Sequence, residues 1–143
     1  MTLFFQMHPS EQCHSMRVYK MLLNNGDTDQ DLLTAALLHD IGKNRYPLSI
    51  WERVIVVLAD IFFPRHVNHW WQGSPSGWRR PFVVAEQHAS WGAEMAADAG
   101  VSPRCADLIC YHHQDNIQEE SINSELSIIN ELLHRLQFAD NNS

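Results

Sequence analysis

The chain has 143 residues, 45% of them hydrophobic and 19% charged, which fits one globular domain with a core of its own. Its formal charge of −7 argues against a nucleic acid as the main partner, because phosphate neutralisation needs a basic face. Three cysteines without a C-x-x-C pair exclude a disulfide framework and favour a reducing cytosol. Neither a signal peptide nor a transmembrane segment is predicted, so we expect a cytoplasmic protein.

Cap and turn signals divide the first part of the chain into helices. Ser10 is expected to cap a helix that ends at 24–26. Thr28, with an acid three residues later, fits a capping box for a second helix that runs to Asp40 and stops at Gly42. No alternating strand pattern interrupts these segments.

The same signals continue along the rest of the chain. Ser49 and its Glu three residues later predict a third helix that ends at Pro64, followed by a Gly/Pro-rich loop over 64–81. Helices are then expected over 82–99, from Ser102, and over 123–140. The predicted fold class is therefore all-α, a bundle of about six helices.

Polar residues interrupt the apolar faces of these predicted helices. His39 and Asp40 end a segment that is apolar nearly all round, and an ionised carboxylate in such a place needs a compensating cation. The chain has nine histidines, and His is the commonest metal ligand. Similar conflicts recur on separate helices, and a bundle brings such residues together in its core. They are His14, His39, Asp40, His88, His112, His113 and Asp140.

The ligands offered are nitrogen and oxygen without thiolate, which favours Fe, Mn, Co, Ni, Zn or Mg over a structural zinc site. Four other histidines, His8, His66, His69 and His134, are interpreted as surface residues. Cys105 and Cys110 do not share a helix face well, and we expect them to be core thiols.

These residues resemble a known family. His14, the string 37–43 (Leu-Leu-His-Asp-Ile-Gly-Lys) and the terminal Phe-Ala-Asp at 138–140 are similar to the signature of the HD-domain metal-dependent phosphohydrolases. The segments at 88–95 and 111–113 resemble the additional ligand segments of two-metal members, including HD-GYP cyclic-di-GMP phosphodiesterases and bacterial diadenosine tetraphosphate hydrolases. The resemblance implies one HD domain over 1–143.

The resemblance implies two divalent ions. The first ion would be held by His14, His39, Asp40 and Asp140, and the second by Asp40 as a bridge with His88 and either His112 or His113. Lys43 would contact substrate phosphate, and His113 would be a ligand or the general acid. The chain lacks Gly-Tyr-Pro after His113, so cyclic-di-GMP is disfavoured, and Ser10 stands where three-metal relatives carry Glu.

The expected activity is hydrolysis of a phosphate ester or anhydride of a nucleotide or another small phosphorylated substrate by metal-activated water. Two alternatives stay open: a di-iron HD-type oxygenase, and a metal- or nucleotide-binding regulatory domain without turnover. Relative to the family's short spacing, about 45–81 is an insertion with one helix and a Trp/Arg-rich loop. It is interpreted as packing on the bundle, as a substrate lid or as an element resting on a membrane.

Overall fold

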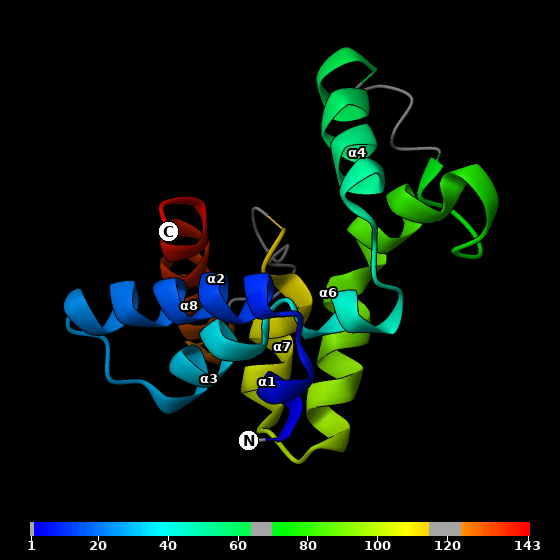
Figure 1. Ribbon diagram of the computed structural model, residues 1–143. Coiled ribbons are helices and arrows are strands. Elements are labelled where there is room, and N and C mark those ends of the chain that lie inside the picture. Colours follow the sequence, from blue (N-terminus) through cyan, green and yellow to red (C-terminus); the bar gives the residue numbers. More distant parts are fainter. Residues whose placement is uncertain (1, 64–69, 115–123) are drawn as a thin grey trace.

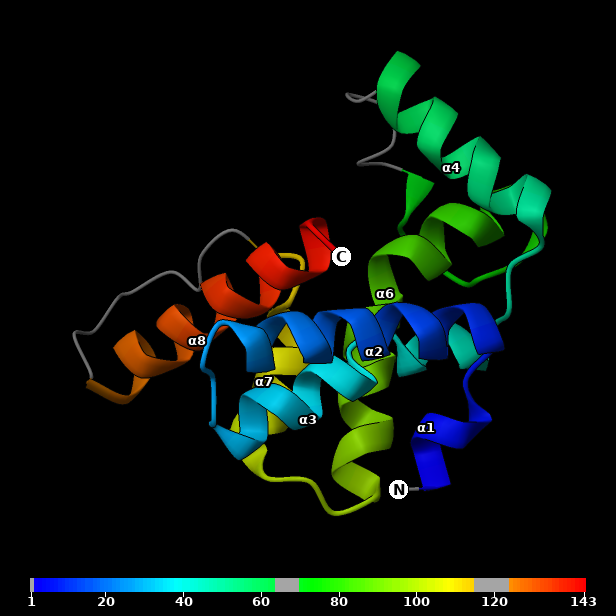
Figure 2. The same ribbon diagram turned by 60° about the vertical axis from the view of Figure 1, so that its left-hand side comes forward.

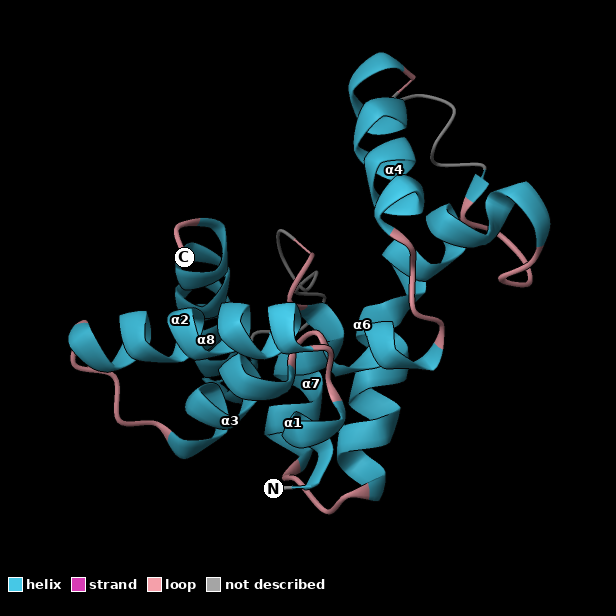
Figure 3. Ribbon diagram, in the orientation of Figure 1, coloured by secondary structure: helices cyan, strands magenta, loops and turns pink. Residues whose placement is uncertain are grey.

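The computed structural model describes residues 2–63, 70–114 and 124–143. Within these ranges every regular element is a helix and there is no strand, which confirms the all-α prediction (Figure 3). None of the described helices is long and apolar enough to cross a lipid bilayer. The α-helices and two short 3-10 helices are α1 (Thr2–Gln6), α2 (Pro9–Asn24), α3 (Gln30–Leu38), η1 (Ile41–Arg45), α4 (Ile50–Phe62), η2 (Gly77–Arg79), α6 (Arg80–Asp98), α7 (Pro103–Tyr111) and α8 (Ser124–Asn141).

Most of the helices form one bundle, and α4 stands apart from it. Figures 1 and 2 both show α2 running across α3, α7 and α8, with α6 on the far side of α7 from α8. The short η1 turn lies against α6, and α4 projects from the bundle near the start of α6. The core of the bundle is therefore built from segments distant in sequence.

The apolar core lies between α2, α3, α7 and α8. Its fully buried side chains include Leu22, Leu32, Leu108 and Leu136, one from each of these helices. Burial of side chains of this size contributes roughly 1.5–3 kcal/mol each, less the cost of ordering them. The polar residues described below lie at the edge of this core.

Two predicted N-caps are wrong by one or two residues. The cap of α2 is His8, whose Nδ1 accepts from the backbone N–H of Ser10, so Ser10 lies inside the helix. The cap of α3 is Asp29 rather than Thr28, because the Asp29 carboxylate accepts from two backbone N–H groups of the first turn. Both N–H groups donate to the same oxygen, Oδ1, and aspartate is a more favourable N-cap than threonine.

The end of α3 also differs from the prediction. The helix stops at Leu38 rather than Asp40, and His39 is its C-cap. Asp40 has φ −95° and ψ 3°, and it begins the tight η1 turn. The reason is packing, because Gly42 in that turn must lie directly against α6.

The other boundaries agree with the prediction more closely. Ser49 and Glu52 form the expected capping box of α4, and Ser102 caps α7 with Pro103 in the first turn. The predicted 82–99 helix begins two residues earlier, at Arg80. Helix α1 was not predicted, and the expected helix end at Pro64 lies outside the described residues.

Candidate metal centre

Three buried histidines present the same nitrogen to a common space. Nδ1 of each ring donates to a backbone carbonyl three residues earlier, at 3.0 Å for His39, 2.8 Å for His88 and 2.7 Å for His112. A carbonyl only accepts, so Nδ1 carries a proton, and Nε2 has a free lone pair whenever the ring is neutral. A carbonyl behind Nδ1 is the usual support of a metal-ligating histidine.

The first group of candidate ligands joins α2, the end of α3 and α8. Nε2 of His14 lies 2.7 Å from Oδ1 of Asp140, and Nε2 of His39 lies 3.4 Å from the same oxygen. One ligand atom from each of the three residues lies within 4.8 Å of the others. Residues 126 positions apart in the sequence thus meet at one point.

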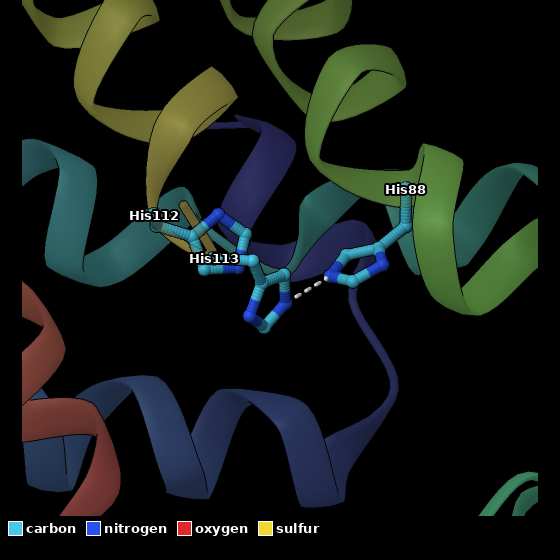
Figure 4. Close-up of side chains that lie close together, drawn as sticks. All are labelled: His88, His112 and His113. Atoms are coloured by element: carbon cyan, nitrogen blue, oxygen red, sulfur yellow. Dashed lines mark hydrogen bonds between the residues drawn. The ribbon is translucent and has the colours of Figure 1, made fainter. Parts of the chain in front are cut away.

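The second group joins α6 and the end of α7. Figure 4 shows His88, His112 and His113 turned toward one another, with Nε2 of His113 3.1 Å from Nε2 of His88. The ligand atoms of this group also lie within 4.8 Å of one another. The ring centroids of His39 and His112 are 5.2 Å apart, so the two groups are neighbours.

Asp40 lies between the two groups. Its Oδ2 is 3.7 Å from Nε2 of His39, and its Oδ1 is 3.5 Å from Nε2 of His88. Nζ of Lys43 lies 2.7 Å from Oδ1, so this oxygen already faces one cation. The carboxylate is buried, and each of its oxygens is directed to a different group.

The carboxylates of the centre remain ionised. Burial alone would raise the pKa of Asp40, but contact with His88 and the positive charges of His39 and Lys43 hold it well below its usual range. Burial alone would also raise the pKa of Asp140, and its contacts with His39 and His14 lower it instead. The centre therefore keeps two negative charges at neutral pH.

The histidines of the two groups differ in their electrostatics. Burial disfavours the imidazolium of His39, but Asp140 and Asp40 outweigh it and raise the pKa of this ring. Burial and neighbouring imidazoles lower the pKa of His112 well below its usual range, and burial and His88 lower the pKa of His113 to about 4. His39 thus favours a positive charge, whereas His112 and His113 favour the neutral ring.

The donor set fits a divalent cation. Among the described residues, Nε2 of His39 and Nε2 of His112 are buried and have no hydrogen-bond partner. A buried polar atom without a partner costs about 1–3 kcal/mol. The need for a partner is clearest at His112, because its ring is neutral and its Nε2 lone pair accepts no hydrogen bond. A metal ion would satisfy these nitrogens.

A close backbone contact fixes the turn that carries Asp40. A Cβ built on Gly42 would lie 2.6 Å from the backbone nitrogen of Gly92 and 2.8 Å from the carbonyl carbon of His88. No side chain fits there. Gly42 therefore lets η1 approach α6 closely enough for Asp40 to reach His88.

Two residues beside the centre, Glu11 and Arg53, were not among the site residues predicted from the sequence. Glu11 is buried in the first turn of α2, with Oε2 3.9 Å from Nζ of Lys43 and Oε1 2.5 Å from the Arg53 guanidinium. Helical spacing is the signal that could have found Glu11, because this residue lies three positions before His14 and hence on the same face of α2.

None of the residues set aside in the sequence belongs to either group of candidate ligands found among the described residues. His8 and His134 are exposed, and Cys105 is a buried free thiol whose pKa is raised to about 12 by burial. His66 and His69 lie outside the described residues.

The family model of the HD domain matches residues 12–141, a range that contains every candidate ligand. The chain belongs to the HD domain family, whose members are generally metal-dependent hydrolases. No curated protein and no solved structure matches the chain. The assignment of individual ligands therefore depends on the geometry above.

Proposed function

We propose that this centre binds two divalent metal ions and that the protein is a metal-dependent phosphohydrolase. The observation that carries the proposal is the buried Asp40 carboxylate, which directs one oxygen to each of two groups of ligand atoms. Membership of the HD domain family supports the same conclusion. In this proposal, residues 1–143 form one HD domain with an insertion over about 45–81.

We assign the ligands by group. His14, His39 and Asp140 would hold one ion, His88, His112 and His113 the other, and Asp40 would contribute an oxygen to each. Nitrogen and oxygen donors favour Fe, Mn, Co, Ni, Zn or Mg. When bound, such ions would polarise a phosphoryl group and lower the pKa of a water that attacks phosphorus.

Lys43 is the residue that we assign to the substrate. Its ammonium is one-third exposed and lines a cavity of about 420 Å³ together with Ser10, Asn44 and Arg53. A flexible stem allows Nζ to leave Oδ1 of Asp40 and contact an oxygen of the substrate phosphate. The substrate that we propose for this contact is a small phosphorylated molecule, a class that includes nucleotides.

His113 is better suited to metal binding than to general-acid catalysis. A general acid at neutral pH must carry a proton, and a ring with a pKa of about 4 does not. A neutral ring beside Nε2 of His88 is a competent ligand. Of the two roles left open by the sequence, we therefore propose that His113 is a metal ligand.

Elemental analysis of the purified protein tests the proposal directly. We expect two divalent ions per chain and their partial loss in His88→Ala, with no change in the control His134→Ala, which alters an exposed histidine of α8. A wild-type protein without metal, or equal metal content in both variants, would contradict the proposed centre.

A phosphate-release assay tests the activity. We expect turnover of at least one mono-, di- or polyphosphorylated nucleotide, abolished by a chelator and restored by a divalent ion. Oxygen consumption measured alongside should be zero, because hydrolysis needs no redox change. Oxygen-dependent turnover would favour the oxygenase alternative, and metal binding without any turnover the regulatory one.

A further inference from the structure

Helix α4 exposes large apolar side chains on one continuous face. Val57 is 58% exposed, Ile61 66% and Phe62 69%, and the first turn adds Ile50 and Trp51. Only Ala59 of this helix is buried. Exposed apolar residues on the bundle are scattered singly, as on most proteins, but a contiguous row of this kind marks an interaction surface.

The exposed face is apolar over about 160° of the helix circumference, taking 100° per residue. The three charged residues of α4, Glu52, Arg53 and Asp60, all fall on the remaining arc. The helix is therefore amphipathic. One edge of its apolar arc, with Ile55 and Phe62, lines a groove of the protein, and the rest, with Val57 and Ile61, is turned to solvent. A helix packed on its own bundle would bury the middle of this arc.

Ion pairs hold α4 in this orientation. Glu52 accepts from Arg80 at the start of α6, and Arg53 donates to the buried Glu11 of α2 at 2.5 Å. Glu52 and Arg53 both lie in the first turns of α4, on the polar arc. Rotation of the apolar face toward the bundle would break both pairs.

A groove beside α4 extends the apolar surface. It measures about 510 Å³ and is lined by Ile55, Leu58 and Phe62 of α4 together with Trp78 and Phe82. Figure 1 shows α4 projecting from the bundle.

The edge of the groove carries an aromatic ring and a cation. Trp78 is 62% exposed, and the Arg79 guanidinium lies 5.2 Å from its ring centroid. Trp51 is exposed at the start of α4. Tryptophan and arginine with an apolar body and a polar end are typical of the boundary between lipid headgroups and hydrocarbon.

We propose that the apolar face of α4 binds the surface of a lipid bilayer, with the helix lying in the plane of the interface. Hydrocarbon fits this face better than a second copy of the chain, because the row offers no hydrogen-bonding side chain apart from the Trp51 indole at its end, and protein interfaces form about one hydrogen bond per 100–200 Å². An in-plane amphipathic helix is an established mode of membrane attachment. The proposal does not depend on the activity of the metal centre.

The charge of the protein specifies the kind of membrane binding. The formal net charge is −7, so anionic headgroups do not attract the chain as a whole. Burial of apolar side chains is then the driving force. Binding should therefore occur on vesicles of phosphatidylcholine alone and should persist at high salt.

Flotation of the full chain with phosphatidylcholine vesicles tests this. We expect the wild type to float at low and at high salt, and the double variant Val57→Glu/Ile61→Glu to lose at least about tenfold in vesicle affinity for each side chain replaced. The matched control is Ile128→Glu, an exposed isoleucine of α8 that should leave flotation unchanged.

Quenching of tryptophan fluorescence by lipids brominated on the acyl chain gives a second readout. We expect quenching in the wild type that decreases in Trp51→Phe and not in Trp91→Phe, which alters a tryptophan of α6. Failure of the wild type to float, or equal flotation of the double and control variants, would overturn the proposal. A dimer that forms without vesicles and dissociates in the double variant would identify a second copy as the occupant and overturn it as well.

Discussion

The metal centre and helix α4 depart from the ordinary pattern of burial in opposite directions. At the centre, charged and polar groups such as Asp40 and His112 are almost completely buried. On α4, large apolar groups such as Ile61 and Phe62 are about two-thirds exposed, at 66% and 69%. Each departure costs free energy unless a partner compensates it, a cation in one region and an apolar phase in the other.

The two regions differ in how far their own side chains compensate this cost. The buried groups partly compensate one another, since Asp40 contacts Lys43 at 2.7 Å and Asp140 contacts His14 at 2.7 Å. The apolar side chains of α4 cannot compensate one another across a single helix. Substitutions at the centre should therefore change both function and stability, whereas those on the outer face of α4 should change binding alone.

The largest effect is expected at the carboxylate between the two groups. Asp40→Ala should lower metal affinity by more than the 10–100-fold typical of residues that only support a ligand. The reason is that the Asp40 carboxylate directs one oxygen to each group, so a single substitution removes an oxygen from each. Titration of the metal-free protein with a divalent ion measures this, with the exposed Asp98→Ala as control. Equal affinities in the two variants would remove Asp40 from the centre.

The next effect tests the backbone contact that supports the centre. Gly42→Ala should lower the free energy of unfolding by about 1–3 kcal/mol, because a Cβ there lies 2.6 Å from the Gly92 nitrogen. Gly92→Ala should cost less, since the nearest atoms to its Cβ lie 3.2 and 3.3 Å away. Urea unfolding of both variants gives the order, and the reverse order would contradict the account of η1.

Acidification should destabilise the metal-free protein. The pKa of His112 is lowered, and that of His113 is about 4, so the unfolded chain binds protons that the folded chain rejects. Stability is then lost as pH falls from about 6.5 toward 4. His39 acts oppositely, because its raised pKa stabilises the fold at low pH and this contribution is lost as pH rises.

Two of these pKa values are lowered and one is raised, so we expect the midpoint of thermal unfolding to fall between pH 7 and pH 5. His112→Leu should reduce this fall, because it removes one of the two rings whose pKa burial lowers. A midpoint that rises on acidification would show that the carboxylate contacts of His39 dominate.

The smallest effect is expected on α4. Ile61→Glu should change the free energy of unfolding by less than about 0.5 kcal/mol, because the side chain is 66% exposed. Leu136→Ala, in the core, should cost about 2–5 kcal/mol. Chemical denaturation of the two variants compares them. A large loss in Ile61→Glu would mean that this face packs within the protein.

Local signals in the sequence predicted helices well and their ends less well. The Ser49 and Ser102 caps depend on neighbours in the chain, and the structure has both. The end of α3 depends on how closely Gly42 approaches α6, a tertiary contact that no local pattern contains. Helix α1 has only five residues, which is too short to show the helical repeat of apolar residues that predicted the others.

The candidate ligands could be proposed from polar residues on apolar faces, and their roles as ligands remain predictions. The contact of Arg53 with Glu11 could not be predicted, because it joins two helices 42 positions apart. The apolar residues of α4 could be identified in the sequence, but the direction in which their face points relative to the bundle depends on such ion pairs.

In each of His39, His88 and His112, Nδ1 contacts its own backbone carbonyl and leaves Nε2 for the centre. A substitution can therefore keep the function of one nitrogen and remove that of the other. An asparagine carries an amide near the position of Nδ1, and a glutamine carries one near Nε2. At His88, Asn would keep a donor for the Ala85 carbonyl and vacate the interior position, and Gln would do the reverse. Each half of an imidazole can thus be removed while the other half stays, which divides the folding role of the ring from its role as a ligand.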